Sequence, residues 1–448
     1  MKKIAATFFL GLLSINSYAA NGSLPASAKF LSDIAIEGTS VAPGTEGENM
    51  SKMGYRSEIL ANNTTTYIKC TYKINKDPAN PASSWIWARY PARPNEYTLI
   101  HGYWRDGSAI TNMFYTIASA QRIKEICQFT LDYHGIDAEV AVPYAGDSFF
   151  SFYYNFWSQG SNLPVAELEG IKLDRLVIFG DSLSDNINLY NASAGALPKN
   201  TSWFYGRFSN GLVWHEYWAN MLNIPSYVWA TANAESGVKP LFPSFNEQID
   251  NFKRYHAYMQ NYDIKKTLFT VLFGGNDFIT GGKNPDDIIN NYRNGLTQLA
   301  QLGAGQIAIL KLPDFSGVPA VRDWSEADKR ALREKSKIFN EKVDTLVTEL
   351  STIYSGTKFI VLSLDKAFNN LLVHADTLGY VNTTDTCLDL KNNSFNYLYH
   401  HEPRPACKSS GAKFIFWDYM HPTTNAHADL SKMLFQELQL KLQEMAHR

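Results

Sequence analysis

The stretch Leu176-Val-Ile-Phe179, followed at once by Gly180-Asp-Ser-Leu183, decides the fold of this 448-residue chain. Its first four residues form a continuous apolar run, which is typical of a parallel strand buried on both faces. Further apolar runs occupy residues 267–273, 307–312 and 359–364, and helical patterns separate them. Strands that alternate with helices predict an α/β fold with a doubly wound parallel sheet.

Between and after these runs, apolar residues recur at the spacing of an α-helix. Pro422 is expected in the first turn of the last helix, where a missing N–H costs nothing. Ligands on such sheets bind at the carboxyl ends of the strands, so catalytic groups are expected there. The predicted helices cover residues 213–222, 245–260, 285–302, 325–350 and 422–445.

The residues before position 160 differ in composition and in hydropathy pattern. They are rich in Thr, Tyr and Trp, and their short runs alternate between apolar and polar residues. This pattern predicts a small β-rich domain with one short helix over residues 118–127. The predicted strands cover residues 65–74, 97–104 and 149–157.

The chain begins with the pattern of an export signal. Lys2 and Lys3 precede an apolar run over residues 4–15, and Ser17-Tyr-Ala19 supplies small residues for cleavage. The run is too short for a membrane anchor, so we predict a cleaved signal peptide and a secreted, extracellular protein. No later stretch reaches about 18 consecutive apolar residues, so the mature chain is expected to be soluble.

This organisation divides the chain into three parts. The polar stretch 158–164 is the expected linker between the two folded parts. The parts are a signal peptide, a β-rich accessory domain and a catalytic domain, over residues 1–19, 20–162 and 163–448.

The chain contains four cysteines, and export makes disulfide pairing the expectation. Pairing Cys70 with Cys127 and Cys387 with Cys407 keeps each bridge inside one domain. No Cys-x-x-Cys or His-Glu-x-x-His spacing occurs, so no metal site is predicted.

The charge balance argues against one class of function. The chain has 41 Lys and Arg against 43 Asp and Glu, a formal net charge of -2. Nucleic-acid binders usually carry a basic excess, so no nucleic-acid partner is expected.

Ser182 follows the first buried run by three residues, in a strand-to-helix turn. A serine hydroxyl is a weak nucleophile that needs a nearby base and hydrogen-bond donors for the oxyanion. Gly-Asp-Ser-Leu occurs by chance in roughly one chain of this length per hundred, and an ordinary helix-capping turn also explains it. The assignment of Ser182 therefore depends on its partners.

Asp418-Tyr-Met-His421 lies between a further apolar stretch and the last predicted helix. A carboxylate three residues before a histidine can bind its Nδ1–H and turn Nε2 toward a nucleophile. His374 and His427 are the alternatives. Position at a strand–helix junction favours His421.

Gly274-Gly-Asn-Asp277 directly follows the run that ends at residue 273. The side-chain amide of Asn276 can donate to a developing oxyanion there. A simple Gly-Asn turn is the alternative explanation. Three such signals at three strand ends together favour a hydrolase site.

These motifs resemble the ordered blocks of the GDSL (SGNH) lipases. The resemblance is closest to secreted thermolabile or lecithin-dependent haemolysin phospholipases, because Tyr67-Ile-Lys-Cys70 and Asn112-Met-Phe-Tyr-Thr116 are similar to their amino-terminal domain. The matching blocks are Phe179-Gly-Asp-Ser-Leu-Ser-Asp185, Gly206-Arg-Phe-Ser-Asn-Gly211, Gly274-Gly-Asn-Asp277 and Phe416-Trp-Asp-Tyr-Met-His-Pro-Thr-Thr424.

The resemblance implies an SGNH-hydrolase fold, which is a flavodoxin-like three-layer parallel sheet, with a small β-rich amino-terminal domain. It implies cleavage of glycerophospholipid acyl esters at a membrane surface, with no metal or organic cofactor. Ser182 would be the nucleophile and an oxyanion donor through its N–H, Asn276 the side-chain donor, His421 the general base and then acid, and Asp418 its orienting carboxylate.

Two stretches depart from the family pattern. The second block usually contains a glycine whose N–H completes the oxyanion hole, but Val228-Trp-Ala-Thr-Ala-Asn233 has none. A backbone N–H survives in any residue except proline, so Asn233 is the expected donor. The block after Ser182 usually continues Asp-x-Gly-Asn, whereas this chain reads Asp185-Asn-Ile-Asn188.

The leading hypothesis is a secreted phospholipase A with a membrane-lytic, haemolytic effect, and lysophospholipase activity is an open extension of it. An acyltransferase that passes the acyl group to cholesterol differs only in the acceptor. An esterase for acetylated sugars keeps the fold but changes the substrate. A non-enzymatic binding or pore-forming toxin would use an aromatic patch made of Trp85, Trp87, Tyr103 and Trp104, although these rings also suit a domain core.

Overall fold

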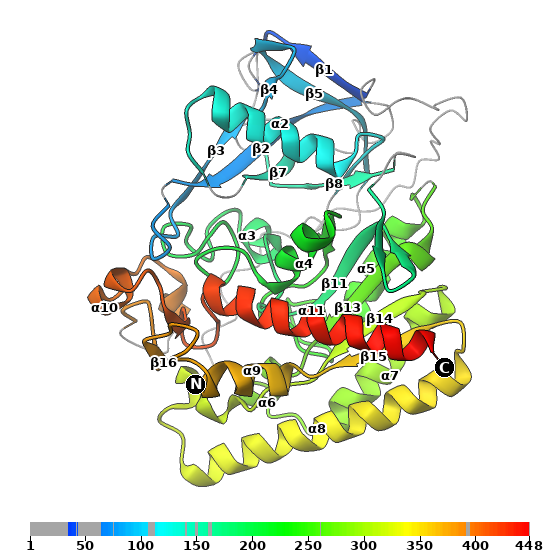
Figure 1. Cartoon of the computed structure of the whole chain (residues 1–448), viewed down its shortest axis with the longest axis vertical. Coiled ribbons are helices and arrows are strands. Elements are labelled where there is room, and N and C mark those ends of the chain that lie inside the picture. Colours follow the sequence, from blue (N-terminus) through cyan, green and yellow to red (C-terminus); the bar gives the residue numbers. More distant parts are fainter. Residues whose placement is uncertain are drawn as a thin grey trace.

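The computed structural model describes residues 35–41, 43, 64–74, 76–105, 113–138, 141–147, 151–159, 164–259, 261–390 and 395–447. The predicted signal peptide and the middle of the predicted linker lie outside the described residues. Figure 1 shows a β-rich amino-terminal part above a layered part in which helices surround a central sheet.

The central sheet has five parallel strands in the order β12-β11-β13-β14-β15. This is the flavodoxin-like order. Four of the strands correspond to the predicted apolar runs, whereas β12 was not predicted because three residues cannot show a period. The bounds are β11 (Arg175–Gly180), β12 (Ser226–Val228), β13 (Thr267–Leu272), β14 (Gln306–Leu310) and β15 (Lys358–Leu362).

Two groups of helices cover the two faces of this sheet. The helix α11 packs against α4 and α9, and α7 packs against α5 and α8, which gives the expected three layers. Five of these helices were predicted to within a few residues, and α9 was missed. The bounds are α4 (Trp214–Leu222), α5 (Phe245–His256), α7 (Pro285–Gln301), α8 (Glu326–Ile353), α9 (Leu364–Val373) and α11 (Thr424–Ala446).

The start of α11 differs from the prediction. The helix begins at Thr424, and the Thr423 side chain caps it by accepting a hydrogen bond from the N–H of Ala426. Threonine is a good N-cap because its hydroxyl satisfies one of the free N–H groups of the first turn. Pro422 therefore precedes the cap and does not lie in the first turn, where it was predicted.

In the residues that the structure describes, the amino-terminal part is an eight-stranded sheet covered by one helix. The Cys70–Cys127 disulfide joins β2 to α2. Of the predicted strand 149–157, residues 151–157 are described, and among these only the end lies in a strand. The predicted helix 118–127 begins at Ala120 and extends to Tyr133. The bounds are β1 (Ile36–Thr39), β2 (Thr64–Lys73), β3 (Ser83–Trp87), β4 (Arg89–Tyr90), β5 (Arg93–Arg105), β6 (Met113–Thr116), β7 (Ala141–Gly146), β8 (Asn155–Ser158) and α2 (Ala120–Tyr133).

Short elements complete the layered part. The Cys387–Cys407 disulfide joins the residues after β16 to α10, so both predicted bridges are present. The strands β16 and β17 are parallel to each other, and β17 leads directly to Asp418. The bounds are β9 (Ala166–Leu168), β10 (Ile171–Leu173), α3 (Asn188–Ala192), η3 (Ile264–Lys266), α6 (Gly275–Ile279), η4 (Phe315–Gly317), η5 (Pro319–Val321), β16 (Asn382–Thr386), η6 (Phe395–Leu398), α10 (Pro405–Ser409) and β17 (Phe414–Phe416).

The lengths and compositions of the described helices bear on membrane insertion. None of them combines the length and the apolar character that crossing a membrane requires.

Candidate active site

Ser182, His421 and Asp418 form a continuous hydrogen-bonded chain at the carboxyl edge of the central sheet. Ser182 Oγ lies 2.7 Å from His421 Nε2, and His421 Nδ1 lies 2.7 Å from Asp418 Oδ1. The histidine and the carboxylate are buried, whereas Ser182 is half-buried. This is the geometry of a nucleophile, a base and an orienting carboxylate, with only the nucleophile open to a substrate.

Asp418 is held in place by donors on both carboxylate oxygens. Oδ1 accepts the N–H groups of Met420 and His421 at 2.9 and 3.0 Å, and Oδ2 accepts the indole N–H of Trp203 at 2.9 Å. Burial alone would raise the pKa of Asp418, but the charge of His421 and these hydrogen bonds outweigh burial and hold this pKa below its usual value. The group is therefore a carboxylate at neutral pH.

The other histidines do not reach Ser182. His427 lies on α11 and is buried, and burial, followed by the charges of His421 and His215, lowers its pKa to about 3. His374 is the C-cap of α9. The structure therefore brings His421, and neither alternative, to Ser182.

Asn276 is the second residue of α6, directly after β13. Its Nδ2 donates to the carbonyl of Ala234 at 3.0 Å, which fixes the amide beside the turn that follows β12. A primary amide has two N–H bonds, so one remains for a ligand. The side chain is half-buried, as an oxyanion donor must be.

Asn233 lies in the turn that Ala234 closes by donating to the carbonyl of Thr231 at 3.1 Å. Its φ is +64°, in the left-handed region that favours glycine and tolerates asparagine. The glycine that the family pattern led us to expect here would adopt this conformation without strain. Within the described part of the chain, the backbone N–H groups of Asn233 and Ser182 donate no hydrogen bond.

The side chain of Asn233 is also held. Lys239 Nζ donates to Asn233 Oδ1 at 2.9 Å and pairs with Glu235 at the same distance. The amide of Asn233 therefore points toward Lys239, and its backbone N–H is the group left for an oxyanion.

Asp185 connects the Ser182 loop to this turn, a role that the sequence analysis did not assign. Its Oδ2 accepts the N–H of Ala232 at 2.8 Å, and its Oδ1 accepts the N–H groups of Ile187 and Asn188 at 2.9 and 2.7 Å. Burial raises the pKa of Asp185 to about 6, against the effect of these hydrogen bonds. The family block that ends at Asp185 was the available signal.

Asn188 supports the same turn from its other end. Its Nδ2 donates to the carbonyls of Val228 and Ala230 at 3.0 and 2.7 Å. Ile187, which replaces the family glycine, has a φ of -172°. Any residue can adopt this extended conformation, so the substitution introduces no backbone strain.

Two cavities border these residues. A cavity of about 50 Å³ has an almost wholly apolar lining that includes Leu183 and Met420, the neighbours of the nucleophile and the base. Thr231 and Lys239 help to line a second cleft of about 330 Å³. Among the described residues, no group of three or more His, Cys, Asp or Glu side chains is placed to hold a metal ion.

Two family models match the chain. The model described as "GDSL-like Lipase/Acylhydrolase" matches residues 176–434. The model described as "Vibrio dual lipase/transferase, N-terminal domain" matches residues 40–159.

Similar proteins agree with these matches. A thermolabile hemolysin of Vibrio parahaemolyticus is 32% identical over 386 residues, which are 85% of this chain and 90% of that protein. A phosphatidylcholine-sterol acyltransferase of Aeromonas hydrophila is 26% identical and covers 61% of this chain and 92% of its own length. The secreted effector protein SseJ of Salmonella typhimurium is 27% identical and covers 58% of this chain and 63% of its own length. The chain therefore belongs to the GDSL-like lipase/acylhydrolase family and is a carboxylic ester hydrolase.

Proposed function

We propose that this protein is a secreted phospholipase A that hydrolyses the acyl esters of glycerophospholipids and thereby lyses membranes. One observation carries the catalytic part of the proposal, the 2.7 Å contacts that join Ser182, His421 and Asp418. The lipid substrate is supported by similarity to a chain named for haemolysis and to another named for phosphatidylcholine. Secretion is supported by the signal-peptide pattern of residues 1–19.

The reaction follows from the positions of these groups. Ser182 Oγ attacks the ester carbonyl carbon while His421 Nε2 takes the hydroxyl proton. The resulting oxyanion accepts the N–H groups of Ser182 and Asn233 and the free amide N–H of Asn276. The C–O bond of the ester then breaks, and the proton on His421 passes to the departing oxygen of the lysophospholipid. Water repeats the sequence on the acyl-enzyme and releases the fatty acid.

Transfer of the acyl group to a sterol is the second candidate function. It is favoured by the acyltransferase similarity and by the dual lipase/transferase model over residues 40–159. The first half of the reaction is the same, and a sterol hydroxyl replaces water in the second half. The remaining alternative hydrolytic function, deacetylation of sugars, has no comparable support from these relatives.

The structure gives no support to the non-enzymatic alternative. Tyr103 and Trp104 are buried, and Trp104 packs against Phe114 and Tyr154 in the core of the amino-terminal part. Tyr103 and Trp104 are therefore core rings that do not face a lipid surface, whereas Trp85 and Trp87 of β3 are half-buried.

The test is mass spectrometry of the products that the purified protein and Ser182→Ala release from mixed phospholipid vesicles, with and without cholesterol. We expect free fatty acid and lysophospholipid from the wild type and neither from the variant. Sterol esters in the cholesterol samples would assign the transferase activity. Membrane lysis that survives in Ser182→Ala would contradict the enzymatic account of lysis.

A further inference from the structure

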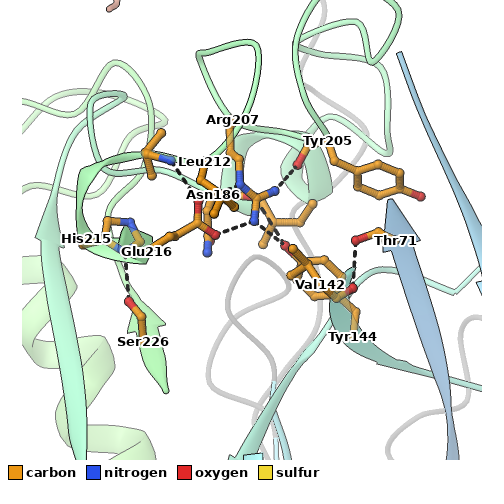
Figure 2. A network of polar contacts seen from close by, with 12 residues as sticks. Thr71, Val142, Tyr144, Asn186, Tyr205, Arg207, Leu212, His215, Glu216 and Ser226 are labelled. Carbon is orange, nitrogen blue, oxygen red and sulfur yellow. Dashed lines mark hydrogen bonds and ion pairs between the residues drawn. The ribbon is translucent and has the colours of Figure 1, made fainter. Parts of the chain in front are cut away.

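The amino-terminal part meets the layered part at a buried polar network, which Figure 2 shows. Its centre is Arg207, which is fully buried and makes a two-pronged ion pair with Glu216, with Nε 2.8 Å from Oε2. Tyr144 of β7 places its hydroxyl within 3.5 Å of both Arg207 and the carbonyl of Asn186. A buried ion pair is costly to leave incomplete, so this network holds Arg207 in one position.

The residues that follow Arg207 lead directly to the catalytic histidine. The ring of Phe208 packs against the imidazole of His421, with centroids 4.8 Å apart. Ser209 Oγ donates to the carbonyl of Pro422 at 3.0 Å. The segment Arg207–Asn210 therefore contacts the loop of the base on two sides.

Asn210 joins this loop to the amino-terminal part with a single side chain. Its Nδ2 donates to the carbonyl of Pro78, in the turn between β2 and β3, at 2.6 Å. Its Oδ1 accepts the N–H of Thr424 at 2.7 Å. The next residue is Gly211, where a Cβ would lie 2.6 Å from Thr424 Oγ1, so the Gly211 backbone lies directly against the Thr424 side chain. Thr424 is three residues after the catalytic histidine.

A second bridge reaches the opposite side of the site. Asn191 of α3 donates to the carbonyl of Tyr153 at 2.9 Å and accepts its N–H at 3.2 Å. Tyr153 lies between β7 and β8 of the amino-terminal part. Three residues before Asn191, Asn188 holds the carbonyls at the start of the oxyanion turn. Both halves of the catalytic machinery are thus tied to the same neighbouring domain.

We propose that the amino-terminal domain positions the catalytic groups, with Asn210 as the positioning residue for the His421 loop and Asn191 as that for the oxyanion turn. Neither residue touches the substrate. Each uses both ends of its amide at once, which fixes a loop in distance and in orientation. Misplacement of a catalytic group by about 1 Å costs on the order of 100-fold in rate, so such contacts set the turnover number.

The proposal rests on the Ser182, His421 and Asp418 assignment of the proposed function and is independent of the lipid substrate. The full-length protein is therefore assayed on soluble p-nitrophenyl butyrate. Asn210→Asp keeps an acceptor for Thr424 but presents a carboxylate to the carbonyl of Pro78, and Asn210→Ala removes both contacts. Asn191→Ala removes the second bridge.

Asn220→Ala is the matched control. Asn220 Oδ1 accepts a hydrogen bond from Lys124 Nζ of α2 at 2.8 Å, so it also joins the two parts of the molecule. Asn220 lies on α4, however, and its contact leads to neither catalytic loop. Stoichiometric labelling of Ser182 with a fluorophosphonate counts the folded sites in every sample, and Ser182→Ala is the blank.

We expect Asn210→Asp and Asn191→Ala to lower kcat per labelled site about 10- to 100-fold, with KM within about twofold of the wild type. The rate of labelling should fall in parallel, while its end point stays unchanged. Asn220→Ala should keep the wild-type kcat. Normal kcat per labelled site in both bridge variants, with only a lower melting temperature, would overturn the proposal, as would an effect confined to KM. Labelling of Ser182→Ala would instead refute the nucleophile assignment itself.

Discussion

Asp185 accepts the N–H of Ala232 at 2.8 Å and so joins the loop of the nucleophile to the turn that carries Asn233. The two loops follow neighbouring strands, β11 and β12, and each carries one backbone oxyanion donor of the proposed mechanism. The carboxylate fixes the spacing of these donors without contacting the substrate.

Asp185→Asn should lower kcat on a soluble ester by about 10- to 100-fold and leave KM nearly unchanged. An amide has one acceptor oxygen and one donor nitrogen, so it cannot accept the N–H groups that both carboxylate oxygens accept now. Loss of one oxyanion donor costs about 10²- to 10³-fold, and displacement of the Asn233 donor should cost less. Steady-state kinetics would measure this. Asp250→Asn, on the exposed face of α5, is the control, and equal effects in both variants would contradict the assignment.

The buried carboxyl of Asp181 should lower the free energy of unfolding as the pH rises from about 4 to about 6. Burial raises the pKa of this carboxyl from 3.8 to about 6, although the N–H of Leu183 donates to it. The folded protein therefore holds this proton more tightly than the unfolded chain, and stability falls with rising pH in that window. This loss of stability is absent below the pKa that Asp181 has in the unfolded chain, and it is complete above about pH 6.

Asp181→Asn tests this, because an amide oxygen can still accept the Leu183 N–H. We expect the variant to be more stable than the wild type at pH 7, by at most about 3 kcal/mol, and equally stable near pH 4. Urea unfolding across this pH range gives the two free energies. A difference that does not change with pH would rule out titration of Asp181 as the cause.

Asn233→Gly and Asn233→Pro distinguish the contribution of the backbone N–H of this residue to kcat from that of its side chain. Glycine keeps the N–H and adopts a φ of +64° without strain, so we expect kcat within about threefold of the wild type. Proline has no N–H and fixes φ near -65°, so kcat should fall by 10²-fold or more. The decisive measurement is kcat per fluorophosphonate-labelled site. Comparable losses in both variants would show that the Lys239 contact of the side chain matters more than the backbone donor.

Asp418→Asn should lower kcat by about 10⁴-fold. The Trp203 indole and two backbone N–H groups all donate to this carboxylate, so an amide must turn its NH₂ toward a donor or offer the wrong group to His421 Nδ1. Trp203→Phe removes one donor only and should cost much less. Kinetics near the wild type for Asp418→Asn would mean that the triad is misassigned.

The sequence predicted those strands and helices whose burial requires a continuous pattern of apolar residues. Four strands of the central sheet are buried on both faces, so their apolar runs stand out from the helices around them. The strand β12 is too short to show a period, and the start of α11 was misplaced because Thr423 caps the helix one residue after Pro422.

The residues of the candidate site likewise fall into those that the sequence predicted and those that it did not. Ser182 and Asn276 follow β11 and β13 closely, so position alone placed them at one edge of the central sheet. His421 follows β17, which pairs with β16 outside that sheet. Asp185 and Asn210 act mainly on backbone N–H and C=O groups, which nearly every residue carries whatever its side chain. Their roles became visible only when the loops that they join were located in space.

The distance along the chain between the two reacting side chains has a consequence for synthesis. Ser182 and His421 are 239 residues apart, and the histidine lies beyond the last strand of the central sheet. A growing chain that has already formed most of this sheet still lacks its base. Under the proposed mechanism the hydrolase is therefore inactive until the segment from β17 to α11 has emerged and docked, which sets the earliest moment at which it can act.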